Sequence, residues 1–121
     1  MQPAYQESDF PLTWPPSVGI YSNMKAKLLL QRRVVTSVNS FVEIVVWRLP
    51  EPLPPCAHPL KYRLALVVEE VCVLRYDNER GKGDHRHEGR TEAAYSFTTP
   101  ERLLADFLAD VERWNHEHGR A

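Results

Sequence analysis

The stretch KYRLALVVEEVCVLRY, residues 61–76, decides the fold that the rest of the chain completes. Apolar side chains occupy every second position of its first half, at Tyr62, Leu64, Leu66 and Val68. Such alternation is typical of a half-buried strand, since successive side chains point to opposite faces of a sheet. A second apolar run, Val71 to Tyr76, follows after a Glu69-Glu70 pair. We therefore predict a tight antiparallel hairpin, although its turn lacks the Asn-Gly or Asp-Gly that such turns prefer.

Further strands are expected on both sides of this hairpin. Residues 25–35 mix Leu and Val with Lys, Gln and Arg, and residues 41–49 (FVEIVVWRL) are dominated by β-branched and aromatic side chains. A short last strand is predicted over residues 92–97. Between residues 49 and 61 five prolines favour an exposed connection, because proline cannot donate to a strand ladder. His58 is interpreted as a surface residue of that connection.

The C-terminal end has the clearest helical pattern. Thr99 is a suitable N-cap, Pro100 suits the first helical position, and Gly119 is a suitable stop. Apolar residues recur at spacings of three and four and form one stripe: Leu103, Leu104, Phe107, Leu108, Val111 and Trp114. The predicted fold class is therefore α+β, an antiparallel sheet of four to five strands with a C-terminal amphipathic helix packed on one face.

Length and composition place this fold in one domain. The chain has 121 residues, a formal net charge of −1 and two cysteines. These values favour a single small domain and exclude a disulfide scaffold, a zinc ribbon and a strongly cationic nucleic-acid-binding protein. We predict the domain over residues 24–121 and a proline-rich tail over residues 1–23, which one interpretation treats as an over-extended start before Met24. With no secretory signal and no apolar run of membrane-spanning length in the sequence, a cytoplasmic location is expected.

The segment RYDNERGKGDHRHEGR, residues 75–90, breaks every apolar period and gathers groups that can do chemistry. His85 and His87 titrate near neutral pH, so one can accept a proton while the other donates one. In an extended strand their side chains would lie on the same side. Cleaving RNA without a metal needs such a pair and a cation for the developing negative charge. Three basic residues of the segment can supply that cation: Arg75, Lys82 and Arg86.

Two other interpretations of this segment stay open. His85 and His87 with Asp77 and Asp84 offer nitrogen and oxygen ligands for Zn²⁺, Mn²⁺ or Ni²⁺, but the surrounding basic residues oppose another cation. Alternatively, residues 77–90 form a solvated, glycine-rich loop whose ion pairs add little stability. Without a substrate role, Tyr76 would cover the sheet edge and Asn78 would cap a turn, instead of contacting a base.

Three parts of the chain, in order, resemble one known family. They are FVEIVVWRLPEPLPPCAHPLKYRLALV (41–67), VLRYDNERGKGDHRH (73–87) and YSFTTPERLLADFLADVERW (95–114). Together they resemble the TumE-like toxins of bacterial toxin–antitoxin operons, with the Glu69-Glu70 turn as a departure from the Asp-Gly type of turn in relatives. The resemblance implies a cytoplasmic toxin that acts on RNA. It also implies a partner, a cognate antitoxin that is typically a small helix-turn-helix-type DNA-binding protein.

Residues and resemblance together predict a metal-independent endoribonuclease toxin that uses no cofactor. The expected catalytic groups are His85 and His87 as acid and base, with Asp77 or Asp84 orienting an imidazole. The residues expected to contact the substrate are Arg75, Tyr76, Asn78, Lys82 and Arg86. The alternative is a non-catalytic module, monomer or homodimer, that binds the antitoxin or nucleic acid and offers residues 49–60 as a docking edge. A net charge of −1 favours a local basic patch over bulk nucleic-acid binding.

Overall fold

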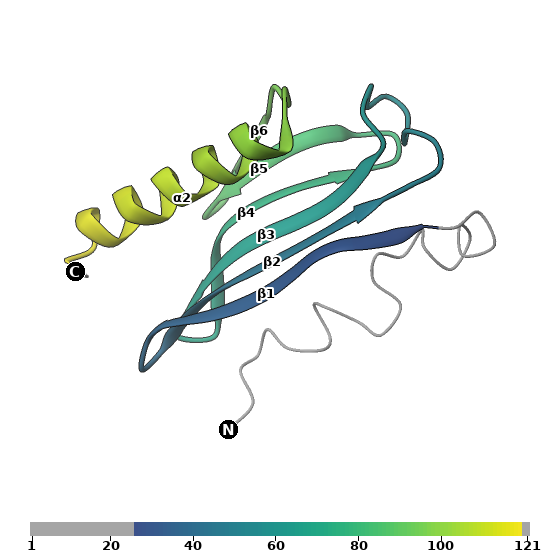
Figure 1. The fold of residues 1–121 in the computed structure, drawn as a ribbon. Coiled ribbons are helices and arrows are strands. Elements are labelled where there is room, and N and C mark those ends of the chain that lie inside the picture. Colours follow the sequence, from purple (N-terminus) through teal and green to yellow (C-terminus); the bar gives the residue numbers. More distant parts are fainter. Residues whose placement is uncertain (1–25, 120–121) are drawn as a thin grey trace.

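The computed structural model describes residues 26–119, and the predicted tail over residues 1–23 lies outside that range. Six strands form one antiparallel sheet in the order of the sequence, from β1 to β6. The elements are β1 Lys27–Ser37, β2 Ser40–Arg48, β3 Leu60–Val68, β4 Val71–Glu79, β5 Gly83–Glu88, β6 Thr91–Ala94 and the helix α2 Pro100–Glu117. Figure 1 shows the strands side by side, with α2 lying along one face of the sheet.

The helix packs on the face made by alternate residues of β2, β3 and β4. Its buried stripe is Leu103, Phe107, Val111 and Trp114. These side chains share one core with Val42, Ile44, Val46, Tyr62, Leu64, Leu66, Leu74 and Tyr76. At the start of the helix, the Arg102 amide donates a hydrogen bond of 3.0 Å to Thr99 Oγ1, which is the predicted cap. The α+β fold class and the single helix-covered face are confirmed for the described residues.

The central hairpin forms at the predicted place. Val68 of β3 lies opposite Val71 of β4, so Glu69 and Glu70 make the turn. Both residues have positive φ, 51° and 69°, the left-handed conformation that a type I′ hairpin turn requires at both of its positions. Glutamate has no intrinsic preference for that conformation. Every residue of β3 is buried, so packing of the strand, not turn chemistry, determines this pairing.

The strand count differs from the prediction because residues 77–90 are not a loop. They complete β4, make a turn through Gly81, and form all of β5. The sequence pattern conceals these strands, since both faces of β5 carry polar side chains and no apolar alternation appears. The sixth strand also begins and ends earlier than predicted, at Thr91 and Ala94 instead of 92 and 97.

The proline-rich connection between β2 and β3 was predicted to be exposed, and this is wrong for its apolar residues. Leu49 and Leu53 are buried in a small core of their own. Backbone hydrogen bonds replace the ladder that proline cannot join: the Leu49 amide donates to the Pro59 carbonyl at 2.7 Å. The Gly81 amide donates to the Pro54 carbonyl at 2.8 Å, which ties the connection to the β4–β5 turn.

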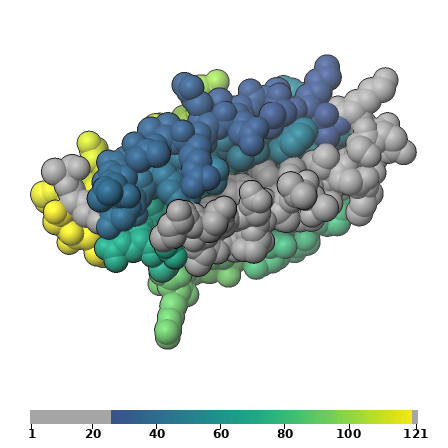
Figure 2. Space-filling view, turned by 90° about the horizontal axis from the view of Figure 1, so that it is seen from below, coloured from purple at the N-terminus to yellow at the C-terminus, as the bar shows by residue number. Residues whose placement is uncertain are grey.

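The strand β1 lies at one edge of the described sheet and keeps large apolar side chains exposed. They are Leu28, Leu29, Val34 and Val35, followed by Val38 in the turn to β2. Figure 2 shows β1 and the turn to β2, in blue, near the C-terminal end of α2, in yellow. Thr36 to Ser40 and the helix residue Asn115 line a common pocket there. Across residues 26–119, no helix has the length and apolar character that crossing a membrane needs.

Candidate active site

Strands β4, β5 and β6 place one group of polar side chains on the face away from α2. Asp77 lies opposite His85 and Arg75 lies opposite His87 in the β4–β5 register. On the other side of β5, His87 lies opposite Glu92 of β6. Side chains at these positions share one face, because they alternate with residues such as Tyr76 that point into the helix-side core.

Two imidazoles and two carboxylates converge at this place. The Nε2 atom of His85 lies 3.1 Å from Asp77 Oδ1 and 3.5 Å from Glu92 Oε2. The Nε2 atom of His87 lies 3.7 Å from Asp77 Oδ1 and 3.6 Å from Glu92 Oε2. Asp77 Oδ1 is buried and, among the described residues, has no partner in hydrogen-bond geometry. We call Asp77, His85, His87 and Glu92 the histidine cluster.

Neighbouring groups determine which ring nitrogens carry protons. The Nδ1 atom of His85 is 3.0 Å from the Gly83 carbonyl, which can only accept, so Nδ1 donates and Nε2 faces the cluster. Arg75 donates from Nη2 to Nε2 of His87 at 3.0 Å, so that nitrogen is unprotonated. Burial, and next the charge of Arg75, lower the pKa of His87 from its ordinary value. At neutral pH His87 is therefore a neutral imidazole.

Two cations border the cluster. Arg75 Nε lies 3.1 Å from Asp77 Oδ2, and Lys82 Nζ lies 3.1 Å from Glu92 Oε2. The hydrogen bond to Glu92 raises the pKa of Lys82, and the same contact lowers the pKa of Glu92. Lys82 keeps half of its side chain exposed, so it can meet a ligand from solvent.

The cluster has the donors for a metal ion but already contains cations. Asp77, His85 and His87 offer ligand atoms that lie within 4.8 Å of one another. However, Arg75 donates to the His87 nitrogen that a metal would need, and it also balances the charge of Asp77. A divalent ion would have to displace this guanidinium and would add further positive charge beside it, whereas an anionic substrate can draw the guanidinium to itself. The arrangement therefore suits an anionic ligand better than a cation.

Four of the predicted site residues lie on the opposite, helix-covered side. Tyr76 and Arg86 both donate to Asp110 Oδ2 of α2, at 2.6 and 2.7 Å. Asn78 is fully buried, where it accepts from the Tyr62 amide and donates to the Leu60 carbonyl. Asp84 accepts from the hydroxyl of Tyr62 at 2.7 Å. The structure thus joins His85 and His87 with Asp77, Arg75 and Lys82, and separates them from these four residues.

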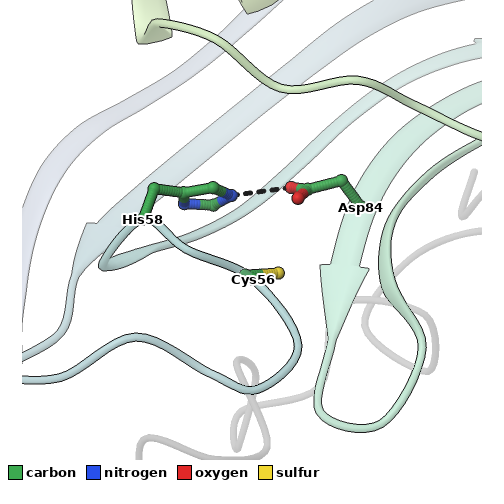
Figure 3. Close-up of side chains that lie close together, drawn as sticks. All are labelled: Cys56, His58 and Asp84. Atoms are coloured by element: carbon green, nitrogen blue, oxygen red, sulfur yellow. Dashed lines mark hydrogen bonds and ion pairs between the residues drawn. The ribbon is translucent and has the colours of Figure 1, made fainter.

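A second cluster was not expected from the sequence. Cys56 and His58 of the proline-rich connection lie beside Asp84 of β5, and Figure 3 shows the three side chains facing one another. His58 Nε2 is 2.8 Å from Asp84 Oδ1, so His58 is not the surface residue that was predicted. Burial, followed by the charge of Asp84, raises the pKa of the Cys56 thiol to about 11. Burial opposes ionisation of Asp84, but hydrogen bonds from His58 and Tyr62 bring the pKa of this carboxyl below its ordinary value.

Glu92 and the Cys56–His58–Asp84 cluster were missed from the sequence for the same reason. Glu92 reaches the histidines through the β5–β6 register, and His58 meets Asp84 across 26 residues. Such long-range neighbours are not encoded by local periodicity. The spacing Cys56-Ala57-His58 is a signal that could have drawn attention to the second cluster.

The comparisons with known proteins identify a family. The family model described as Toxin TumE matches residues 25–115, which is most of the chain and includes both clusters. No curated protein and no solved structure matches the chain.

Proposed function

Because this chain belongs to the TumE toxin family, we propose that it is a toxin that cleaves RNA in the cytoplasm as a metal-independent endoribonuclease. Its partner in this proposal is a cognate antitoxin of the small helix-turn-helix type. The proposed catalytic groups are His85 and His87, oriented by Asp77, with Arg75 and Lys82 as the cations that meet the phosphate.

The observation that carries the proposal is the position of the Glu92 carboxylate. Its Oε2 atom lies 3.5 Å from His85 Nε2, 3.6 Å from His87 Nε2 and 3.1 Å from Lys82 Nζ. An anionic oxygen placed there contacts two titratable nitrogens and an ammonium group together. A phosphodiester that displaces this exposed carboxylate would have a base, an acid and a cation around its phosphorus.

The chemistry follows from the protonation states. An RNA phosphate draws the Arg75 guanidinium away from Nε2 of His87. The neutral ring then removes the proton of the 2′-hydroxyl through this freed nitrogen, and the 2′-oxygen attacks the adjacent phosphorus. The bond from phosphorus to the 5′-oxygen breaks, and in this proposal His85 takes part as an imidazolium whose Nε2 gives that oxygen its proton. The products are a 2′,3′-cyclic phosphate and a free 5′-hydroxyl. Lys82 and Arg75 balance the charge that builds up on the phosphoryl oxygens.

The test is an RNA cleavage assay with an excess of a strong chelator throughout. Purified toxin should cut single-stranded RNA and leave 2′,3′-cyclic phosphate ends, detected by mass spectrometry. A matched oligonucleotide with 2′-deoxyribose at every position should stay intact, because it lacks the nucleophile. Cleavage that stops with the chelator, or equal cleavage of the deoxy substrate, would contradict the proposed mechanism.

The second candidate function is a non-catalytic module that binds antitoxin or nucleic acid. The observation in its favour is the set of large apolar side chains left exposed on β1 at one edge of the described sheet, since exposed apolar surface often marks protein contacts. Lys27, Arg32 and Arg33 on the same strand would suit an acidic partner segment. A cleavage assay that finds no turnover, together with antitoxin binding lost on Val35→Asp, would favour this candidate.

A further inference from the structure

We propose that Cys56, His58 and Asp84 form a Zn²⁺ site that fastens the proline-rich connection to β5. This site lies on the other side of β5 from the histidine cluster and does not depend on the proposed ribonuclease activity. Its three donors are a sulfur, a nitrogen and an oxygen, and they lie within 4.8 Å of one another. Thiolate, imidazole and carboxylate together are the ligands of zinc, not of Mg²⁺ or Ca²⁺.

The spacing of the donors is close to what zinc needs. A tetrahedral ion with bonds of about 2.0–2.3 Å holds nitrogen and oxygen ligands about 3.3 Å apart, and a sulfur ligand about 3.6 Å from each. His58 Nε2 and Asp84 Oδ1 are 2.8 Å apart as a hydrogen-bonded pair. They must therefore separate by roughly 0.5 Å, which a rotation of either side chain provides. Figure 3 shows the Cys56 sulfur on the same side as both groups, where it completes the triangle.

Surrounding contacts hold the donors in place, as they do around zinc ligands generally. Tyr62 donates its hydroxyl to Asp84 at 2.7 Å, and Asn78 donates to the Cys56 sulfur at 3.7 Å. The ring of Phe97 stacks on the ring of His58, with 3.8 Å between centroids. These contacts come from β3, β4 and the segment before α2, so each donor is oriented from a different element.

Zinc binding releases one proton and moves another within the His58 ring. The Cys56 thiol releases its proton to solvent and becomes the thiolate ligand. His58 gives up the proton that Nε2 shares with Asp84 and carries its proton on Nδ1 instead, so Nε2 can bind the ion. In the structure, the Leu60 amide donates a hydrogen bond to His58 Nδ1 at 3.2 Å. In the zinc-bound protein Nδ1 carries a proton, so the amide loses this acceptor. The Leu60 amide is thus a reporter of the bound state.

A bound Zn²⁺ would hold the proline-rich connection against β5, the strand that carries His85 and His87. Cys56 and His58 belong to the connection between β2 and β3, whereas Asp84 immediately precedes His85 in β5. The approach of the two segments is already close, since a side chain at Gly83 would meet Pro55 at 3.3 Å. Zinc would join these segments by coordinate bonds and stabilise the folded chain, because the unfolded chain does not hold the three donors together.

Cobalt provides the direct test, because Co²⁺ replaces Zn²⁺ and a thiolate–cobalt bond adds a charge-transfer band in the near ultraviolet. Metal-free full-length protein should bind one Co²⁺ with this band, and one Zn²⁺ should abolish the band by displacement. Cys56→Ser should lose the band and bind Zn²⁺ at least about tenfold more weakly. The matched control is Cys72→Ser, which removes the other cysteine and should leave the band unchanged.

Two further measurements keep the test decisive if Cys56→Ser does not fold. His58→Gln should also weaken Zn²⁺ binding at least about tenfold, and Zn²⁺ should shift the Leu60 amide resonance of the wild type. A His85→Ala/His87→Ala double variant should keep both Zn²⁺ affinity and the cobalt band. Binding without a thiolate band, or binding that the double variant abolishes, would assign the ion to the histidine cluster and overturn the proposal; absence of binding would overturn it too.

Discussion

The two faces of β5 show how one short strand can serve two purposes. On the helix side, Arg86 and Glu88 are paired with residues of α2: Arg86 donates to Asp110 at 2.7 Å, and Arg113 donates to Glu88 at 2.7 Å. On the other side, His85 and His87 face Asp77 and Glu92 at 3.1 to 3.7 Å. Both faces of β5 carry polar side chains. They differ in how completely their hydrogen bonds are made.

That difference indicates which face is structural and which is available for chemistry. Each polar group on the helix side has a short, well-directed partner, so its interactions stabilise the fold. On the histidine side, Asp77 Oδ1 and Arg75 Nε are buried and make close contacts without hydrogen-bond geometry. A site that is completed by its substrate has this character. Substitutions on the two faces should therefore separate activity from stability.

The largest expected effect is on catalysis, from His87→Ala. Loss of the proposed base should slow RNA cleavage by about 10² to 10⁴-fold. The free energy of unfolding should change by less than about 1 kcal/mol, because the His87 ring accepts one hydrogen bond, from Arg75, and is partly exposed. Cleavage rates and urea unfolding measure the two quantities. His116→Ala, at the exposed end of α2, is the control; equal rates for both variants would remove His87 from the mechanism.

The next largest effect, from Arg86→Ala, should be on stability and not on catalysis. This change removes the 2.7 Å contact to the partly buried Asp110 and one of the two guanidinium contacts of Glu88, while Arg113 still reaches both carboxylates. We therefore expect a loss of about 2–3 kcal/mol in the free energy of unfolding. Cleavage per folded molecule should stay close to wild type, because Arg86 points away from the histidine cluster. Arg102→Ala is the matched control: its side chain is 69% exposed and pairs with Asp106 within the helix. It should cost less than about 0.5 kcal/mol.

Arg86 also shows where sequence reasoning was sufficient and where it was not. The helix, the central hairpin and the convergence of His85 with His87 follow from local patterns of period 3.6 and period 2. The same alternation implies that Arg86 and Asp84 point away from the histidines, yet a segment without apolar residues gave no sign that it was a strand. Glu92 and His58 could not be placed, because their positions depend on register between strands and on a proline-rich path that no local pattern encodes.

The two faces should also titrate in different pH windows. Burial and the charge of Arg75 lower the pKa of His87, so the base is mainly neutral at pH 7, and cleavage should fall as the pH drops through this lowered pKa. The neighbouring charges of Asp77 and Glu92 act on the pKa of His87 in the opposite direction, and that of His85 acts in the same direction as Arg75. On the helix side, burial raises the pKa of Asp110, but hydrogen bonds from Arg86 and Tyr76 bring it below its ordinary value.

The sign of the stability change follows from that lowered pKa. A carboxyl that is more acidic in the folded protein contributes stability above its unfolded pKa of about 3.9, and loses it as the pH falls through the folded value. Activity should therefore decline only below the ordinary histidine pKa of about 6.5, and the helix-side contribution should disappear only below about pH 4. Rate profiles and urea unfolding as a function of pH separate the two. In Asp110→Asn the loss of stability below pH 4 should be reduced; an unchanged slope would place the acid sensitivity elsewhere.

The smallest effect should come from Glu92→Gln and should increase binding. Glu92 occupies the place proposed for the phosphate and neutralises Lys82, so removing its charge frees the ammonium and both imidazoles for RNA. Binding of a 2′-O-methyl RNA, which cannot be cleaved, should tighten by about two- to fivefold, the scale of one exposed ion pair. Glu101→Gln, at the exposed start of α2, controls for net charge alone. Weaker binding by Glu92→Gln would instead mean that Glu92 contacts the substrate, and the histidine face would then use a carboxylate as well as two imidazoles.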